Sequence, residues 1–214
     1  MKNENLNIIY LDWKNEEHVN AVSLLHMKLL PESILSKLGL EFLCKFYYSK
    51  LCKENLIEVY LYKMNQNFVG FISCTNKPFS FTKEGERKYK FTIYRLLIKS
   101  IFFKPTNFVT LLKQTKDLAL IDFRVKGNEK MGQFLSFGVL EKYRKHIDEI
   151  DQCSVPNVLM KMVFTHFKKN NSNFFLQVLK SNISAIKFYD KYNGMVFKTD
   201  VISKSNIVVF NVKD

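Results

Sequence analysis

Few residues of this chain combine types and spacings that could do acid–base or metal chemistry. The 4 cysteines form no C-x-x-C pair and the 4 histidines are scattered, so the ligand spacing of a zinc site is missing and we expect no metal centre. Histidine is the side chain whose ordinary pKa lies near neutral pH. On this ground the candidate bases are His26, His146 and His166.

Length and composition limit the kind of fold that can position these residues. The chain has 214 residues, of which 47% are apolar and 25% are charged. These values are ordinary for a globular protein, and a chain of this length can bury a large core. We therefore expect one domain over residues 1–214, with an insertion at about 77–128.

The charge of the chain is strongly positive, but it is made mostly of lysine. Lys and Arg number 33 against 20 Asp and Glu, a net charge of +13, and only 4 of the 33 are arginine. Base readout favours the planar arginine fork, so we expect a solvated basic surface and no nucleic-acid partner. The excess gathers in residues 77–118, which hold 10 basic and 3 acidic side chains.

Targeting and membrane-spanning segments are not expected. The N-terminus lacks the apolar core of a signal peptide. The longest apolar stretch, at 93–103, contains Arg95 and Lys99 and is far shorter than the roughly 20 residues that span a bilayer. The sequence therefore predicts a cytoplasmic protein with reduced thiols.

Apolar periodicity predicts the order β-α-α-β-β, a helical insertion, and then β-α-β-α-β-β. Such mixed elements form a sheet with helices packed on its faces. Strands are expected at 7–11, 57–62, 68–74, 133–139, 174–179, 195–197 and 207–212, and helices at 18–30, 33–52, 155–169 and 183–192.

The insertion predicts two amphipathic helices, at 92–103 and 107–116, in which aromatic and aliphatic residues alternate with Lys and Arg. Basic amphipathic helices with aromatic residues are typical of segments that bind membrane surfaces. Packing on the sheet or on a second subunit is the interpretation we favour, which leaves a homodimer open. A protein partner or an anionic membrane surface is the alternative.

The C-terminal part of the chain carries a recognisable motif. Residues 181–198 read SNISAIKFYDKYNGMVFK, in which Asn182, Ala185, Phe188, Tyr189 and Gly194 follow one another at characteristic spacing. This segment resembles the end of the GNAT N-acetyltransferase superfamily. Residues 134–144 resemble the central strand of that family, and residues 26–51 resemble its first two helices.

The resemblance implies an α/β (α+β) fold with a mixed, mostly antiparallel sheet of about 6–7 strands. Helices would flank this sheet, and the helical insertion would lie between the third and fourth strands. The implied activity is transfer of an acyl group, usually acetyl, from acetyl-CoA to an amine, without a metal. The acceptor would be a small-molecule amine, with amino sugars and sugar nucleotides among the candidates.

Tyr189 is the residue to which the resemblance assigns a catalytic role, as the general acid beside the coenzyme sulfur. A phenol has an ordinary pKa near 10, so it is protonated at neutral pH and can donate to a leaving thiolate. The alternative is a core aromatic residue. Asn182 can cap its helix, contact the coenzyme, or do both.

The resemblance also implies a coenzyme site and an acceptor side. Gly138 in the central strand would permit a local distortion, or it would only avoid a packing clash. His26 is a candidate base near the acceptor side, which would include Leu30 and Pro31. The implied coenzyme-binding residues are Phe137, Gly138, Val139, Arg144, Lys145, Asn157, Val158, Asn182, Ala185 and Tyr189.

This chain departs from the family pattern in two places. Gln133 stands where many members have a glutamate base, and glutamine cannot accept a proton at neutral pH. Residues 144–157 contain no glycine, although the family has a glycine-rich loop here whose backbone N–H groups hold a diphosphate. Asp148, Glu149 and Asp151 would oppose a phosphate group. A GNAT-like binding module with weak or no activity is therefore the second interpretation.

Overall fold

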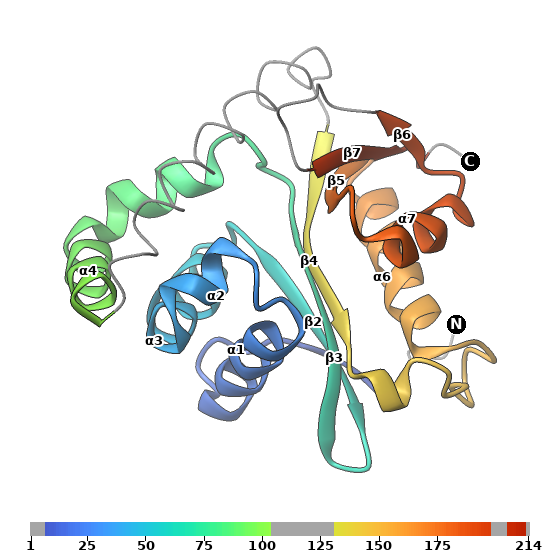
Figure 1. The fold of residues 1–214 in the computed structure, drawn as a ribbon, viewed down its shortest axis with the longest axis horizontal. Helices are drawn as coiled ribbons and strands as arrows, with labels where there is room; N and C mark the ends of the chain where they lie inside the picture. Colours follow the sequence, from blue (N-terminus) through green and yellow to red (C-terminus); the bar gives the residue numbers. More distant parts are fainter. Residues whose placement is uncertain (1–6, 104–130, 198–204, 213–214) are drawn as a thin grey trace.

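The computed structural model describes residues 7–103, 131–197 and 205–212. Its centre is a 7-stranded sheet in the order β1-β2-β3-β4-β5-β7-β6 (Figure 1). All neighbouring strands are antiparallel except β4 and β5, which are parallel. The strands are β1 (Ile8–Tyr10), β2 (Glu58–Met64), β3 (Asn67–Thr75), β4 (Met131–Val139), β5 (Asn173–Leu179), β6 (Met195–Phe197) and β7 (Ser205–Phe210).

Helices cover both faces of this sheet, which confirms the predicted fold class. The N-terminal helices lie on one face, and α6 and α7 lie on the other (Figure 1). The helical insertion, α4, lies between the third and fourth strands as predicted. The helices are α1 (Glu16–Leu29), α2 (Ile34–Leu38), α3 (Leu40–Phe42), α4 (Phe81–Phe103), α6 (Val155–Lys169) and α7 (Ile183–Asp190), with a π-helix at Leu43–Leu51 and a 3-10 turn at Glu141–Tyr143. No helix among the described residues is both long and apolar enough to cross a membrane.

The predicted second helix, 33–52, is divided into three segments. Ser33 caps its start as expected, because its side chain accepts a hydrogen bond from the Ser36 N–H. Gly39 then has φ 96°, a left-handed conformation that ends α2 and that other residues rarely adopt. The chain continues as α3 and the π-helix Leu43–Leu51. The prediction of one continuous helix was wrong because it did not treat Gly39 as a break.

The insertion helix α4 begins well before the predicted start at residue 92. Its first turns pack tightly, since a Cβ on Gly85 would lie 2.4 Å from Leu51 Cδ2. Phe81 and Leu96 are buried in the same core as Leu51. The helix is kinked at Tyr89, whose hydroxyl donates to Glu54 at 2.6 Å. The predicted helix at 107–116 lies outside the described residues.

An aromatic stack fills the space between the sheet and α6. Phe167 stacks on Phe174 with ring centroids 4.6 Å apart, and Phe174 stacks on Phe210 at 4.7 Å. Gly132 of β4 makes room for this stack, because a Cβ at that position would lie 2.0 Å from Phe167 Cε1. The start of β4 is therefore held against α6 by close packing.

Replacing Gly132 with alanine tests this packing. Gly132→Ala is expected to lower the free energy of unfolding by about 1–3 kcal/mol, because the extra methyl group forces Phe167 out of its stack. Urea denaturation measures the change. Lys168→Ala, on the exposed side of α6 next to Phe167, is the control and should change stability by less than about 0.5 kcal/mol. Equal effects of the two changes would contradict the packing described here.

Candidate active site at the fork between two strands

Strands β4 and β5 separate within the sheet and form a fork. They pair from Met131 with Asn173 to Phe134 with Leu176, and no pairing of the two continues beyond that point in the described chain. β5 then pairs only with β7 as far as Leu179. The second half of β4 therefore has a free edge on its β5 side.

A β-bulge lies at the point of separation. On the other edge of β4, Ser136 pairs with Ser73 and Phe134 with Cys74, so Leu135 is the extra residue. A local distortion at Gly138 was one of two roles expected for this residue, but Gly138 pairs regularly with Phe71. Its missing side chain makes room for Leu29 of α1, since a Cβ would lie 2.7 Å from Leu29 Cδ1. Of the two predicted roles of Gly138, the structure supports avoidance of a packing clash.

The free edge of β4 presents backbone hydrogen-bonding groups. The Leu140 N–H donates to Val69 O of β3 at 2.9 Å. Because successive residues of an antiparallel ladder point to opposite sides, the N–H and C=O groups of Phe137 and Val139 face away from β3. The Val139 carbonyl accepts a hydrogen bond from Arg144 Nε at 3.1 Å. This edge can receive the amides of an extended ligand laid beside β4.

Tyr189 lies at the apex of the fork. Its ring contacts Phe134, the last β4 residue paired with β5, edge-on with centroids 6.4 Å apart. Phe210 contacts the other side at 6.3 Å. Burial raises the pKa of the Tyr189 hydroxyl above its ordinary value, so the group is protonated at neutral pH and can donate a proton.

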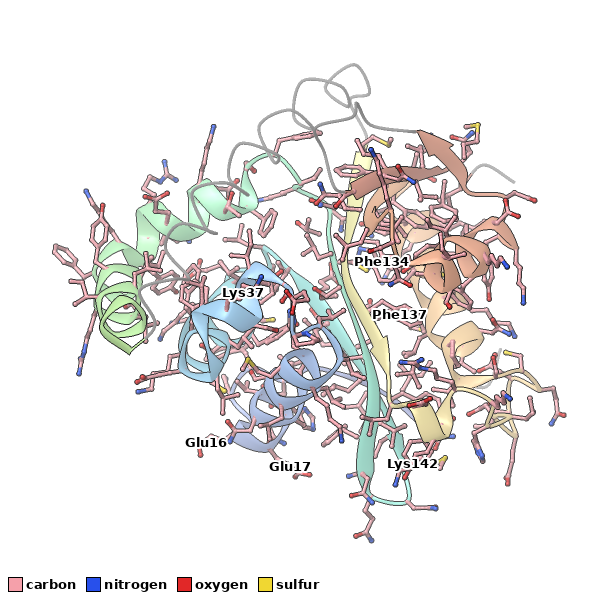
Figure 2. The ribbon with its side chains drawn as sticks, in the orientation of Figure 1. Glu16, Glu17, Lys37, Phe134, Phe137 and Lys142 are labelled. Carbon is pink, nitrogen blue, oxygen red and sulfur yellow. The ribbon has the colours of Figure 1, made fainter. Side chains whose placement is uncertain are left out.

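Helix α7 holds Tyr189 in place. Asn182 caps this helix by accepting a hydrogen bond from the Ala185 N–H at 3.1 Å. Phe188 stacks on Phe137 with centroids 5.7 Å apart, which fixes α7 against β4. Phe134 and Phe137 lie on the side of β4 that faces α6 and α7 (Figure 2). The motif residues Asn182, Ala185 and Tyr189 and the strand residue Phe137 thus meet at one place.

The first turn of α6, the expected diphosphate site, is less suited to an anion. The Val155 N–H donates to His146 O at 3.1 Å, and the N–H groups of Asn157 and Val158 both donate to Ser154 O. Pro156 has no N–H. A helix N-terminus binds anions through free N–H groups, and these are already bonded within the chain. The Val158 side chain is buried in the core.

The loop before α6 is organised by a buried carboxylate instead of glycines. One Asp148 oxygen accepts hydrogen bonds from the N–H groups of Ile150 and Asp151, at 3.0 and 2.7 Å. The other accepts from the Tyr62 hydroxyl and from Asn7 Nδ2. Asp148 is 1% exposed and points into the loop, so it does not face a bound phosphate as the sequence suggested. Asp148 therefore holds the N–H groups of Ile150 and Asp151 toward the inside of the loop.

The remaining predicted coenzyme residues lie around this loop. Arg144 and Lys145 are exposed directly after β4, and Arg144 is anchored by its bond to Val139 O. Asn157 accepts a hydrogen bond from the Tyr192 hydroxyl at 2.8 Å, which ties α6 to the end of α7. Exposed basic side chains, and few free helix N–H groups, are therefore what the described chain offers to an anion at this end of the fork.

His26 belongs to a buried hydrogen-bonded chain under the acceptor-side turn. Its Nδ1 lies 2.6 Å from the Tyr48 hydroxyl and its Nε2 lies 2.9 Å from Ser33 Oγ. Ser33 donates to Ser36, which donates to Leu30 O at 2.7 Å. Burial lowers the pKa of His26 to about 4. His26 thus holds the Leu30–Pro31 turn as a neutral imidazole.

The other candidate bases lie elsewhere. His166 is buried on α6, where its ring contacts Tyr60, Glu58 and Asn76. His146 is exposed in the loop before α6. Gln133 pairs with Thr75 and Phe175 at the closed end of the fork. No group of three His, Cys, Asp or Glu residues suited to a metal ion occurs in the described part of the chain.

The sequence did not predict the roles of three residues of this site: Leu135, Tyr48 and Asp148. The bulge at Leu135 depends on strand pairing, for which the sequence carries no local signal. Tyr48 lies within the predicted helix at 33–52, but the sequence carries no signal of its contact with His26. A carboxylate followed two and three residues later by backbone donors is a turn signature, and that signal could have identified Asp148.

The neutral state of His26 predicts a pH dependence of stability. The folded pKa, about 4, is below the ordinary value of 6.5, so the stabilisation is complete above pH 6.5 and is lost as the pH falls toward 4. The wild type is expected to lose about 3 kcal/mol more than His26→Gln over this interval. Urea denaturation at several pH values measures this difference. Parallel pH profiles of the two proteins would contradict burial of His26 as a neutral group.

Removal of the Asp148 carboxylate tests its role in the loop. Asp148→Ala is expected to lower the free energy of unfolding by about 2–4 kcal/mol, because several buried donors lose their acceptor. Glu149→Ala is the control, since this exposed side chain neighbours Asp148 in the same loop, and it should change stability by less than about 0.5 kcal/mol. A mild effect of Asp148→Ala, equal to that of the control, would show that the loop does not depend on it.

Known proteins share this arrangement of elements. No family model matches the sequence, and no curated protein shows significant similarity to it. Among solved structures, a GNAT-family acetyltransferase from Staphylococcus aureus is 16% identical with a TM-score of 0.51, and the match covers 97% of this chain and 99% of that one. Arabidopsis thaliana NAA60 in complex with a bisubstrate analogue is 13% identical with a TM-score of 0.52, covering 95% and 97%.

A third structure shows the same likeness. The PaiA N-acetyltransferase from Thermoplasma acidophilum, in complex with coenzyme A, is 13% identical with a TM-score of 0.50, and the match covers 94% of this chain and 97% of that one. The strand order, the parallel β4–β5 pair and these three matches agree with the resemblance found in the sequence. The chain therefore has the fold of the GNAT N-acetyltransferases.

Proposed function

We propose that this protein is an acyl-CoA-dependent N-acyltransferase, with acetyl-CoA as the donor, that works at the fork between β4 and β5. The observation that carries the proposal is the position of Tyr189, a protonated buried phenol, at the apex of an open strand edge. Two of the similar structures are described as complexes with coenzyme A or with a bisubstrate analogue.

The pantetheine arm of the donor fits the free edge of β4. It is an extended chain with two amide groups, and the backbone N–H and C=O of Phe137 and the N–H of Val139 are placed to bond to such a chain. The phosphates would then lie beyond the end of β4, near Lys142, Arg144 and Lys145. Because the first turn of α6 has few free N–H groups, we infer that these side chains hold the phosphates.

The proposed reaction needs few contributions from the side chains of the protein. A neutral amine attacks the thioester carbonyl, so a C–N bond forms and the C–S bond breaks, and the amine loses one proton while the thiolate gains one. Tyr189 is the donor of the proton to the leaving sulfur. Holding the amine and the thioester at attack distance supplies much of the rate. His26 can take the amine proton only through the hydroxyl groups bonded to it, since its side chain is fully buried.

For the acceptor we propose a small-molecule amine that approaches along the turn at Leu30 and Pro31, between α1 and α2. This turn is held rigid by the chain of hydrogen bonds through Ser33 and Ser36. Amino sugars and sugar nucleotides stay among the candidate acceptors, because the basic helix α4 lies on the same face of the sheet as α1 and α2 (Figure 1).

A binding module without acyltransferase activity is the second candidate function. The bonded N–H groups in the first turn of α6 favour it, since they remove the backbone contacts to phosphate on which the fold usually relies. Titration calorimetry with acetyl-CoA separates the two candidates. A binding signal that weakens as salt is added is expected from the first, because Lys and Arg side chains carry the contacts to phosphate. The absence of binding at millimolar acetyl-CoA would refute the acyltransferase proposal.

The Tyr189 hydroxyl provides the sharper test. Tyr189→Phe is expected to lower kcat by about 10²-fold or more, the usual contribution of a positioned acid, and to leave the affinity for acetyl-CoA within about twofold. Turnover is followed by thiol release with a panel of amines. Tyr192→Phe, which removes only the bond to Asn157, is the control and should keep most of kcat. Equal turnover of Tyr189→Phe and wild type would exclude this residue as the acid.

A further inference from the structure

Helix α4 has a second apolar stripe, on the side opposite to the one that packs on the domain. Its inner side is buried through Phe81, Gly85 and Leu96. On the outer side, Phe91 is 89% exposed, the most exposed of the large apolar side chains in the described chain. Tyr94 and Ile98 are also exposed and follow Phe91 by three and seven residues, so the three form one stripe.

Basic side chains flank this stripe. Lys90 and Arg95 lie on its two sides by helical spacing, in the part of α4 that follows the kink at Tyr89, and Arg87 belongs to the part of α4 before this kink. Lys90 Nζ lies over the Tyr94 ring, 5.7 Å from its centroid. No ion pair joins these three basic groups to an acidic side chain within the described ranges. We call Lys90, Phe91, Tyr94, Arg95 and Ile98 the outer face of α4.

We propose that the outer face of α4 binds the surface of an anionic lipid bilayer, with the helix lying in the plane of the interface. Phe91, Tyr94 and Ile98 would enter the boundary between headgroups and acyl chains, while the flanking cations would contact the acidic headgroups. The core side of α4 fixes the helix to the domain, so the outer face is presented as a preformed ridge.

Charge favours the lipid surface over other occupants of this face. In an isologous dimer, two copies of the outer face would place Lys and Arg against Lys and Arg. Residues 104–130 carry 6 basic and 3 acidic side chains, so they too have the charge of the face they would cover. A nucleic acid would need cations at the centre of the face to meet phosphates, but the centre is apolar and the cations lie at its borders.

This inference does not depend on the proposed activity, since the outer face of α4 shares no residue with the fork. It is tested by sedimenting the full-length protein with large vesicles of phosphatidylcholine alone or with 30% phosphatidylserine. We expect sedimentation with the anionic vesicles only, decreasing as salt is raised. Equal sedimentation with both kinds of vesicle, or with neither, would overturn the proposal.

Paired variants separate insertion of the outer face from the general attraction of a basic protein. Phe91→Ser together with Ile98→Ser is expected to weaken binding to anionic vesicles by about tenfold or more, because two inserted apolar side chains are lost. Leu24→Ser, at an exposed apolar position of α1, is the matched control and should bind as the wild type does. Wild-type binding by the double variant would show that net charge alone attracts the protein, which would overturn the proposal.

A spectroscopic probe reports insertion directly. Phe91→Trp is expected to shift its fluorescence to shorter wavelength on anionic vesicles, whereas Leu24→Trp should not shift. Both signals are measured as differences from the wild type, which contains only Trp13. No shift at position 91, or an equal shift at both positions, would overturn the proposal. So would binding of duplex DNA or of an acidic peptide that depends on Phe91 and Ile98 in the absence of vesicle binding.

Discussion

The separation of β4 from β5 inside a continuous sheet is the constraint on which the rest of this structure depends. A strand that loses its neighbour leaves backbone N–H and C=O groups that must find other partners or remain open to a ligand. The bulge at Leu135 starts this separation, and the aromatic contact between Phe137 and Phe188 keeps α7 beside the strand. Tyr189 lies at the apex because α7 is held there.

Side-chain hydrogen bonds order the end of the fork in this chain. Asp148 collects the donors of the loop before α6, and Ser154 and His146 accept those of the helix itself. A loop without glycine can therefore be ordered, but it presents few N–H groups outward. Arg144 and Lys145 are exposed there, and they are the groups that we propose to bind the phosphates. Contacts of this kind are screened by salt, which distinguishes this site from a cradle of helix N–H groups.

Much of this fold was predictable because its signals are local. Short apolar runs, with alternation at 57–62, marked the strands of the sheet, and the spacing from Asn182 to Tyr189 marked the helix that carries the proposed acid. Features that depend on tertiary contacts were not predictable. The position of the bulge is set by the pairing of β3 with β4, and the early start of α4 is set by the fit of Gly85 against Leu51. Asp148 was taken for a charge opposing phosphate because its burial depends on tertiary contacts with Tyr62 and Asn7.

The proposed acyltransferase activity requires that acetyl-CoA binds along the free edge of β4. Hydrogen exchange of the full-length protein, with and without acetyl-CoA, measures this at the backbone itself. The fork predicts slower exchange of the Phe137 and Val139 amides when acetyl-CoA is bound, while the amides of Ser136 and Gly138, which face β3, change little. Binding of acetyl-CoA without protection of Phe137 and Val139 would contradict a coenzyme site at the fork.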